Sequence, residues 1–237
     1  MHRHENTFLT LEELGAHYAP YAPNYDIRWN YATLHHWRLG RSVAKNSGLI
    51  ELKRGDRSVI DGWLRKDDAL KLYEMAYYAP GDILELGSYH GLSTTILAKA
   101  NRAAGNQRRI VSVDLTPDAV EITRDTLRSQ GLDQNVSNIQ DDAVHAVQSF
   151  VDAGRTFGFV FVDHSHAYTP VYEVCRRLGP IVVPDGFCLF HDFNDPRNRD
   201  EQDESYGVYQ AVVAGMDPAQ FEFWGTYGCT ALYRRIK

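Results

Sequence analysis

Short apolar runs alternate with amphipathic stretches from residue 83 onward, and this alternation predicts strands that alternate with helices. The predicted strands are 83–86, 110–113, 157–162, 187–190, 221–224 and 230–233, with a weaker run at 135–139 near an edge. Nearly continuous apolar runs of this length are typical of parallel strands covered on both faces. Helical spacing of apolar residues predicts helices at 67–78, 92–100, 118–130, 144–151, 171–178 and 205–216.

This order of elements predicts an α/β fold with a doubly wound, mostly parallel, seven-stranded sheet. A parallel strand pair needs a crossover connection, and the amphipathic stretches between the runs are long enough to supply helical crossovers. Only residues 225–229 separate the last two runs, which is too short for a helix. We therefore expect those two strands to form an antiparallel pair at the end of the sheet.

Residues 1–79 do not follow this rhythm. Residues 17–40 are dense in Tyr, Trp and His. One interpretation is a helical extension that packs on the sheet or in a dimer interface, and the other is a lid that lines a substrate pocket. We therefore divide the chain into an aromatic-rich N-terminal extension, residues 1–60, and a ligand-binding domain, residues 61–237, and we keep a homo-oligomer as a candidate assembly.

Composition and charge narrow the classes of function. The chain has 237 residues, 43% of them hydrophobic, with a net charge of −6, which argues against a nucleic-acid partner. No apolar stretch has the length of a signal core or a membrane span, so we expect no membrane partner. Cys175, Cys188 and Cys229 are widely spaced and odd in number, which predicts reduced thiols in a cytoplasmic protein.

The stretch GDILELGSYHGLSTT, residues 81–95, leads from a predicted strand through a Gly-rich turn into a helix. A dinucleotide fingerprint would place a second glycine at Tyr89 and a third at Leu92, where a pyrophosphate needs close backbone approach. No Lys followed by Ser or Thr completes a phosphate loop. A pyrophosphate ligand is therefore not predicted, although the turn amides remain suited to a ligand carboxylate.

Four acidic residues stand at successive strand ends, namely Glu85, Asp114, Asp142 and Asp163. Ligands of open α/β sheets bind at the carboxyl ends of the strands, where these residues meet. Glu85 is placed to hold an ammonium group or a water, Asp114 to accept ribose hydroxyls and Asp142 to meet an adenine amino group. Each acid alone could instead cap a helix or lie in a solvated loop. Together they describe S-adenosylmethionine (SAM), for which the candidate binding residues are Glu85, Gly87, Ser88, Tyr89, Gly91, Ser93, Asp114, Asp142 and Asp163.

Residues 60–237 resemble class I SAM-dependent methyltransferases. Residues 81–100 resemble the first motif of that family, and VSVD, ending at Asp114, resembles its acidic second motif. The segments FVDHSHAYTP and FHDF resemble a bacterial subgroup of cephalosporin-hydroxylase-like and macrocin O-methyltransferase-like proteins. Ser165 stands where that subgroup often has a second Asp. The resemblance implies a Rossmann-like methyltransferase fold that acts on a small-molecule acceptor.

The resemblance also implies catalytic groups at the ends of the fourth and fifth strands of the predicted series. Candidate catalytic residues are Asp163, His166 and His191, and candidate ligands of Mg²⁺ or another divalent cation are Asp163, His191 and Asp192. Catechol-type O-methyltransferases have Asp-Asn at the second position, whereas this chain has Asp192-Phe193. A metal-free general base, His166 or His191, is the alternative.

The leading hypothesis is a SAM-dependent methyltransferase that methylates a hydroxyl of a small molecule, with a divalent cation as a candidate cofactor. One alternative is a NAD-dependent oxidoreductase on a Rossmann sheet, against which the failed fingerprint counts. Another is a non-catalytic protein that keeps the SAM-binding fold for binding or assembly. Retention of all four strand-end acids argues against the second alternative.

Overall fold

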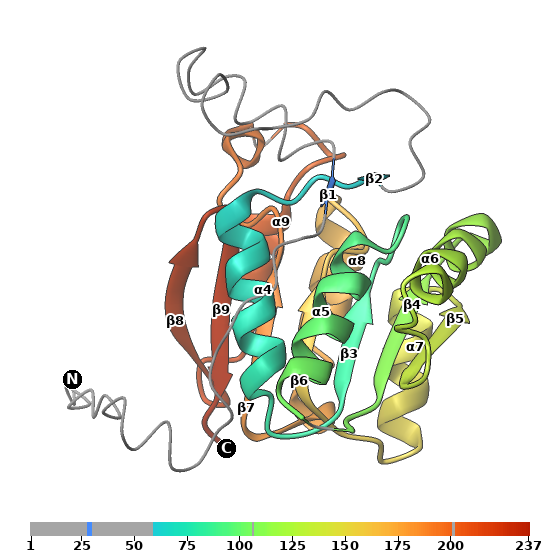
Figure 1. The fold of residues 1–237 in the computed structure, drawn as a ribbon. Coiled ribbons are helices and arrows are strands. Elements are labelled where there is room, and N and C mark those ends of the chain that lie inside the picture. Colours follow the sequence, from blue (N-terminus) through green and yellow to red (C-terminus); the bar gives the residue numbers. More distant parts are fainter. Residues whose placement is uncertain (1–27, 30–58, 106, 201) are drawn as a thin grey trace.

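A computed structural model of the chain describes residues 28–29, 59–105, 107–200 and 202–237 (Figure 1). Apart from the short segments 28–29 and 59–60, the predicted extension at residues 1–60 lies outside the described residues. These two segments form β1 (Arg28–Trp29) and β2 (Val59–Ile60), which pair in parallel as a small separate sheet. The lid and the dimer contact therefore stay predictions.

The main sheet has seven strands in the order β5-β4-β3-β6-β7-β9-β8. Its strands are β3 (Ile83–Leu86), β4 (Ile110–Asp114), β5 (Val136–Gln140), β6 (Phe157–Val162), β7 (Val182–Phe190), β8 (Phe221–Tyr227) and β9 (Thr230–Arg235). The strands from β5 to β7 pair in parallel, and β9 is antiparallel to both β7 and β8. The predicted fold class and the antiparallel end of the sheet are thus confirmed, and the weak run forms the edge strand β5.

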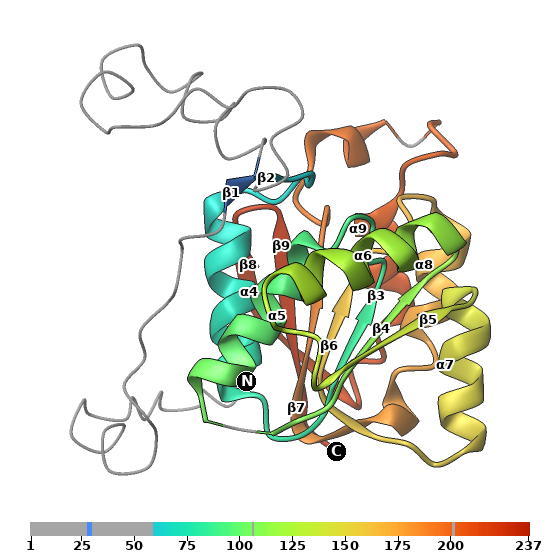
Figure 2. The same ribbon diagram turned by 45° about the vertical axis from the view of Figure 1, so that its right-hand side comes forward.

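Helices cover both faces of this sheet (Figures 1 and 2). One face carries α4 (Lys66–Tyr78), α5 (Leu92–Ala103) and α6 (Pro117–Ser129), and the other carries α7 (Ala143–Asp152), α8 (Tyr168–Cys175) and α9 (Val208–Gly215). Two short 3₁₀ helices, η1 (Gly179–Ile181) and η2 (Pro196–Arg199), complete the described elements. Among these elements, none has the length and apolar character of a bilayer-crossing helix.

The central strand β6 shows why the sequence forms this sheet. Val160 and Val162 pack into the core under α7, α8 and α9, whereas Phe159 and Phe161 pack into the core under α4 and α5. Alternate residues of a strand point to opposite faces, so a continuously apolar strand is stable only between two helical layers. Burial of one such phenylalanine stabilises the fold by roughly 1.5–3 kcal/mol. This packing fixes the end of β6, where Asp163 follows.

Strand β7 begins at Val182, earlier than the run 187–190 predicts. Its first half contains Pro184 and Gly186, and Asp185 has a φ of 63°. The pairing with β6 shifts register there, because Phe157 pairs with Val182 and Phe159 with Phe187. A bulge carries the strand through residues that read locally as a turn.

Candidate active site

A cavity of about 610 Å³ lies at the carboxyl ends of the parallel strands. Its wall is formed by segment 61–65, the turn between β3 and α5, the ends of β4, β6 and β7, and the turn between β8 and β9. The predicted site residues in this wall are Gly87, Ser88, Tyr89, Ser93, Asp114, Asp163, His166, His191 and Asp192. The cavity thus joins most of the residues expected to bind a cofactor with those expected to act on a substrate.

Glu85 lies in β3 outside the residues that line the cavity. It is fully buried, and its Oε2 atom accepts hydrogen bonds from Thr94 Oγ1 at 2.6 Å and Ser112 Oγ at 2.5 Å. Burial raises the pKa of Glu85 to about 7, although the hydroxyl donors oppose the shift. The carboxyl group therefore joins β3 to α5 and β4 behind the turn, and its cofactor role stays a prediction.

Asp142 and Gly91 also lie outside the lining, and both begin helices. The exposed Asp142 carboxylate accepts hydrogen bonds from the backbone amides of Val144 at 2.9 Å and His145 at 3.1 Å, so it caps α7. Gly91 is the N-cap of α5 with a φ of 84°. A contact of Asp142 with adenine is not tested by this arrangement and stays a prediction.

Gly87 allows the β3–α5 turn to touch the end of β6. Its φ is 95°, and a Cβ atom there would lie only 2.3 Å from the carbonyl oxygen of Asp163. Glycine alone adopts this conformation without strain and leaves room for the neighbouring backbone. The close approach places the turn and Asp163 side by side in the cavity wall.

Asp114 holds the same turn from β4. Its Oδ2 atom accepts hydrogen bonds from the backbone amides of Ser88 at 3.0 Å and Tyr89 at 2.9 Å, and its Oδ1 atom accepts one from Thr116 at 3.1 Å. These turn amides therefore point to a protein carboxylate and not to a ligand. A second carboxylate or a pyrophosphate would be repelled there, which supports the prediction that the turn does not cradle a pyrophosphate.

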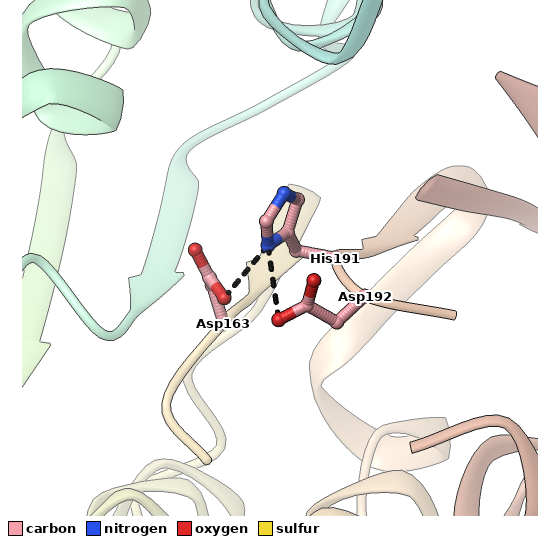
Figure 3. Close-up of side chains that lie close together, drawn as sticks. All are labelled: Asp163, His191 and Asp192. Carbon is pink, nitrogen blue, oxygen red and sulfur yellow. Dashed lines mark hydrogen bonds and ion pairs between the residues drawn. The ribbon is translucent and has the colours of Figure 1, made fainter. Parts of the chain in front are cut away.

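His191 and two carboxylates meet at the ends of β6 and β7 (Figure 3). The His191 Nδ1 atom lies 3.1 Å from Asp163 Oδ1 and 3.5 Å from Asp192 Oδ2. His191 and Asp192 are buried, and Asp192 has a φ of 59°. This unusual backbone conformation turns two consecutive side chains toward the same cluster.

Asp192 also contacts the half-exposed His166. The His166 Nε2 atom lies 3.0 Å from Asp192 Oδ2, and this hydrogen bond is the main reason that the pKa of His166 is raised. Burial alone would raise the pKa of Asp192, but hydrogen bonds from His166 and His191 hold it well below its ordinary value. Asp192 is therefore an anion at neutral pH.

The pKa values of the other titratable groups in the cavity depend on burial and on the charges around each group. Burial alone would lower the pKa of His191, but Asp163, Asp192 and Asp68 raise it well above its ordinary value. Burial raises the pKa of Asp163, and His191 offsets part of that rise. His164 also lines the cavity, and burial lowers its pKa to about 4, so it is neutral at pH 7.

The predicted metal ligands Asp163, His191 and Asp192 offer donor atoms that lie within 4.8 Å of one another. Two carboxylates and an imidazole suit Mg²⁺, Mn²⁺ or a similar cation, with water and substrate as further ligands. A second group, Asp192, Asp195 and Cys229, has the same spread of donor atoms. Asp195 already forms two hydrogen bonds with the Arg197 guanidinium, at 2.9 and 3.2 Å. The first group is therefore the better fit.

The charged loop after β7 contacts the site through Tyr206. The Arg197 guanidinium lies 4.1 Å from the centre of the Tyr206 ring. The His166 ring stacks on the same tyrosine, with the two ring centres 5.1 Å apart. The Gly207 amide donates a hydrogen bond to the His166 carbonyl at 2.8 Å. The loop therefore braces His166.

Sequence reasoning missed several cavity residues, namely Asp61, Gly62, Trp63, Leu64, Arg65, Leu92, Asp195, Arg197 and Cys229. Most of them lie in loops or turns with no recognisable motif. Arg197 lies in η2, within the charged loop 194–205 that follows β7. Only proximity to the Gly-rich turn or to Asp192 identifies them, and that proximity depends on the tertiary fold.

Comparisons with known proteins agree with this geometry. Residues 84–193 match a family model described as a methyltransferase domain. The chain is 31% identical over 107 residues to a catechol O-methyltransferase of Mycobacterium tuberculosis, across 44% of this chain and 46% of that protein. The chain spans about half the length of the curated relatives it matches.

Solved structures share the fold. The O-methyltransferase TomG of Streptomyces achromogenes, solved with SAM, has a TM-score of 0.59 and 19% identity, over 71% of this chain and 79% of that one. An rRNA methylase from Streptococcus thermophilus has a TM-score of 0.51 and 12% identity, over 70% of this chain and 94% of that one. At these identities the likeness establishes the fold alone.

Proposed function

We propose that the chain, whose residues 84–193 form a class I SAM-dependent methyltransferase domain, transfers a methyl group from SAM to a hydroxyl oxygen of a small molecule. The observation that carries this proposal is the single cavity shared by Asp114 and the cluster of Asp163, His191 and Asp192. One end suits a nucleoside, and the other end suits proton transfer from an acceptor.

The charge of the cavity favours SAM over NAD. Five lining residues are aspartates, at positions 61, 114, 163, 192 and 195, whereas Arg65 and Arg197 are the only arginine or lysine residues in the lining of this described cavity. A negative field attracts a sulfonium cation and repels the pyrophosphate of a dinucleotide. Asp114 keeps acceptor capacity for ribose hydroxyls beyond its bonds to the turn, because a carboxylate has about four acceptor positions.

When bound, SAM supplies an electrophilic methyl group, so the residues of this chain need to align the acceptor and remove its proton. His166 is the proposed base, since its ring is half exposed and its Nε2 atom contacts the anionic Asp192. Asp192 would stabilise the imidazolium that forms after proton uptake. A divalent cation held by Asp163, His191 and Asp192 would lower the pKa of an acceptor hydroxyl.

The proposal is tested by calorimetry with SAM, S-adenosylhomocysteine (SAH) and NAD, followed by methyl transfer from labelled SAM to catechols and sugars. Binding of NAD in preference to SAM would overturn it. A parallel assay with total RNA tests the acceptor class, because solved rRNA methylases share this fold. If RNA is labelled and the small molecules are not, the acceptor is RNA and the proposed small-molecule acceptor is wrong.

Asp192→Asn tests the proposed removal of the acceptor proton separately from SAM binding. We expect turnover to fall by about 100-fold or more, in the range of a lost general base or metal ligand, while SAH binding stays within twofold. Asp203→Asn, in the exposed part of the same loop, is the matched control. Unchanged turnover in Asp192→Asn would refute this placement of the chemistry. If EDTA removes turnover and Mg²⁺ restores it, the cation is supported, whereas full turnover in EDTA assigns proton removal to His166 alone.

A further inference from the structure

We propose that Trp63, in the segment between β2 and α4, is a specificity-determining residue whose indole ring stacks on a flat ring of the acceptor. The inference rests on the proposed function, because it names the kind of acceptor that the cavity takes. Trp63 precedes residues 84–193, which match the methyltransferase-domain model, and the sequence alone does not single it out as a site residue.

The segment 61–65 turns one side to the protein and the other side to the cavity. All five residues line the cavity, and buried and exposed positions alternate from residue 61 to residue 64. A Cβ atom on Gly62 would lie 2.2 Å from the Leu92 side chain, and Leu64 belongs to the core under α4 and α5. Alternate side chains of an extended chain point to opposite sides. Trp63 therefore points away from the core, and 67% of its surface is exposed.

The start of the segment lies against the Gly-rich turn. The Asp61 Oδ2 atom lies 3.6 Å from the Nδ1 atom of His90. The His90 ring stacks on the Tyr89 ring, with the ring centres 3.8 Å apart and the planes 8° apart. Tyr89 has a φ of 47°, which is unusual for a residue other than glycine, and its amide is bonded to Asp114. The segment thus begins beside the proposed ribose site.

The end of the segment lies beside the acidic cluster. The Arg65 amide donates a hydrogen bond to Asp68 Oδ2 at 2.9 Å, and the Cys229 amide donates one to Asp68 Oδ1 at 2.6 Å. Asp68 is completely buried, and its Oδ2 atom lies 3.6 Å from His191 Nε2. Figures 1 and 2 show β2 and the start of α4 on the side of the sheet where the parallel strands end. The segment therefore crosses the cavity wall from the proposed cofactor end to the proposed acceptor end, with Trp63 at its midpoint.

A tryptophan at this place suits an acceptor that contains a ring. Pockets for small molecules are lined largely by apolar and aromatic side chains, while a few polar groups fix the orientation of the ligand. An indole presents a large, rigid, flat surface on which an aromatic ring stacks with an offset. The C–H face of a sugar ring has the same flat, apolar character, whereas an open-chain polyol has no such face. Stacking on Trp63 would restrict the orientation of the acceptor, which an in-line methyl transfer requires.

Trp63→Ala tests this role by kinetics and by cofactor binding. We expect KM for a ring acceptor to rise by about 10-fold, while Kd for SAH stays within twofold. Trp63→Phe keeps a flat ring and should stay within about threefold of the wild-type KM. Trp63→Leu keeps apolar bulk without the flat face, so it gives the same comparison if Trp63→Ala does not fold. Weaker SAH binding with an unchanged KM for the acceptor would assign Trp63 to the cofactor and overturn the proposal.

Trp224→Ala is the matched control, because Trp224 is 46% exposed on β8 and does not line this cavity. We expect its KM for the acceptor and its Kd for SAH to equal those of the wild type. If Trp63→Ala raises KM no more than Trp224→Ala does, the proposal is wrong.

Three acceptors identify the feature that is recognised. Catechol presents an aromatic ring, methyl glucoside presents a sugar ring, and sorbitol has hydroxyl groups on an open chain. We expect methyl transfer to one of the two rings, with a KM that depends on Trp63, and little transfer to sorbitol. The ring that is methylated distinguishes an aromatic acceptor from a sugar. Equal methylation of sorbitol would show that a flat face is not required, and would overturn the proposal.

Tryptophan fluorescence of the SAH complex measures ring binding without turnover. We expect catechol or methyl glucoside to cause a saturable change in the wild type and no such change in Trp63→Phe, which retains the other three tryptophans. The same change in both proteins, or no change with either ring, would overturn the proposal. Ring binding that depends on Trp63 without methyl transfer would refute the proposed function and leave the role of Trp63 intact. Methyl transfer to a ring with the same KM in Trp63→Ala would do the reverse.

Discussion

Asp114→Ala removes a carboxylate that holds the β3–α5 turn and is also the proposed ligand of the cofactor ribose. Two bonds, from the backbone amides of Ser88 and Tyr89, lose their acceptor. Hydrogen bonds to charged groups contribute about 1.5–3 kcal/mol each, and water reaches this turn and replaces part of that. We therefore expect a loss of about 2 kcal/mol, which lowers Tm by roughly 4–8 °C in a chain of this size.

The same change should weaken SAH binding. Loss of two hydrogen bonds from ribose hydroxyls to the carboxylate costs about 3 kcal/mol, which corresponds to about 100-fold in Kd. Scanning calorimetry without ligand and titration calorimetry with SAH measure the two effects separately. Asp114→Asn, which keeps one acceptor oxygen, should fall between the wild type and Asp114→Ala in both. An unchanged Kd for SAH in Asp114→Ala would refute the assignment of the ribose site.

Two further substitutions test the turn and its surroundings. Because the pKa of Glu85 is raised from 4.5 to about 7, the folded state binds a proton more tightly, so its stability should fall as pH rises from 4.5 to 7. Glu85→Gln should remove this pH dependence and raise the free energy of unfolding at pH 8 by up to ~3 kcal/mol. The measurement is Tm as a function of pH for both proteins. Parallel curves for the wild type and the variant would contradict the expectation. Gly87→Ala should cost more than about 2 kcal/mol because of its collision with Asp163. Gly105→Ala, with a φ of 68° and open space around it, measures the backbone strain alone, and equal losses in the two variants would exclude the collision.

The succession of strands and helices along the chain was predictable because each buried strand is continuously apolar and each helix has one apolar face. The ILEL and FGFVFV segments form β3 and β6 as expected. The start of β7 was not predictable, since Pro184 and Gly186 interrupt the pattern and the bulge depends on pairing with β6. Local sequence describes the turn-like residues but not the neighbouring strand that accommodates them.

The sequence placed several cavity residues correctly because they lie at the ends of predicted strands. Asp114 and Asp163 stand directly after apolar runs, Asp192 follows another run by one residue, and all three line one cavity. Glu85 shares a face of β3 with Ile83, so it points toward α5 and not into the cavity. Asp68 gave no signal, since an acid in the first turn of a helix usually stabilises the helix end alone. Its contact with His191 joins residues 123 positions apart, which only the tertiary fold reveals.

The bond between the Cys229 amide and Asp68 spans 161 residues of sequence. During folding, the Asp68 carboxylate on α4 lacks this backbone donor until the hairpin of β8 and β9 has formed. The start of α4 is therefore fully bonded only after the last hairpin of the chain has joined the sheet.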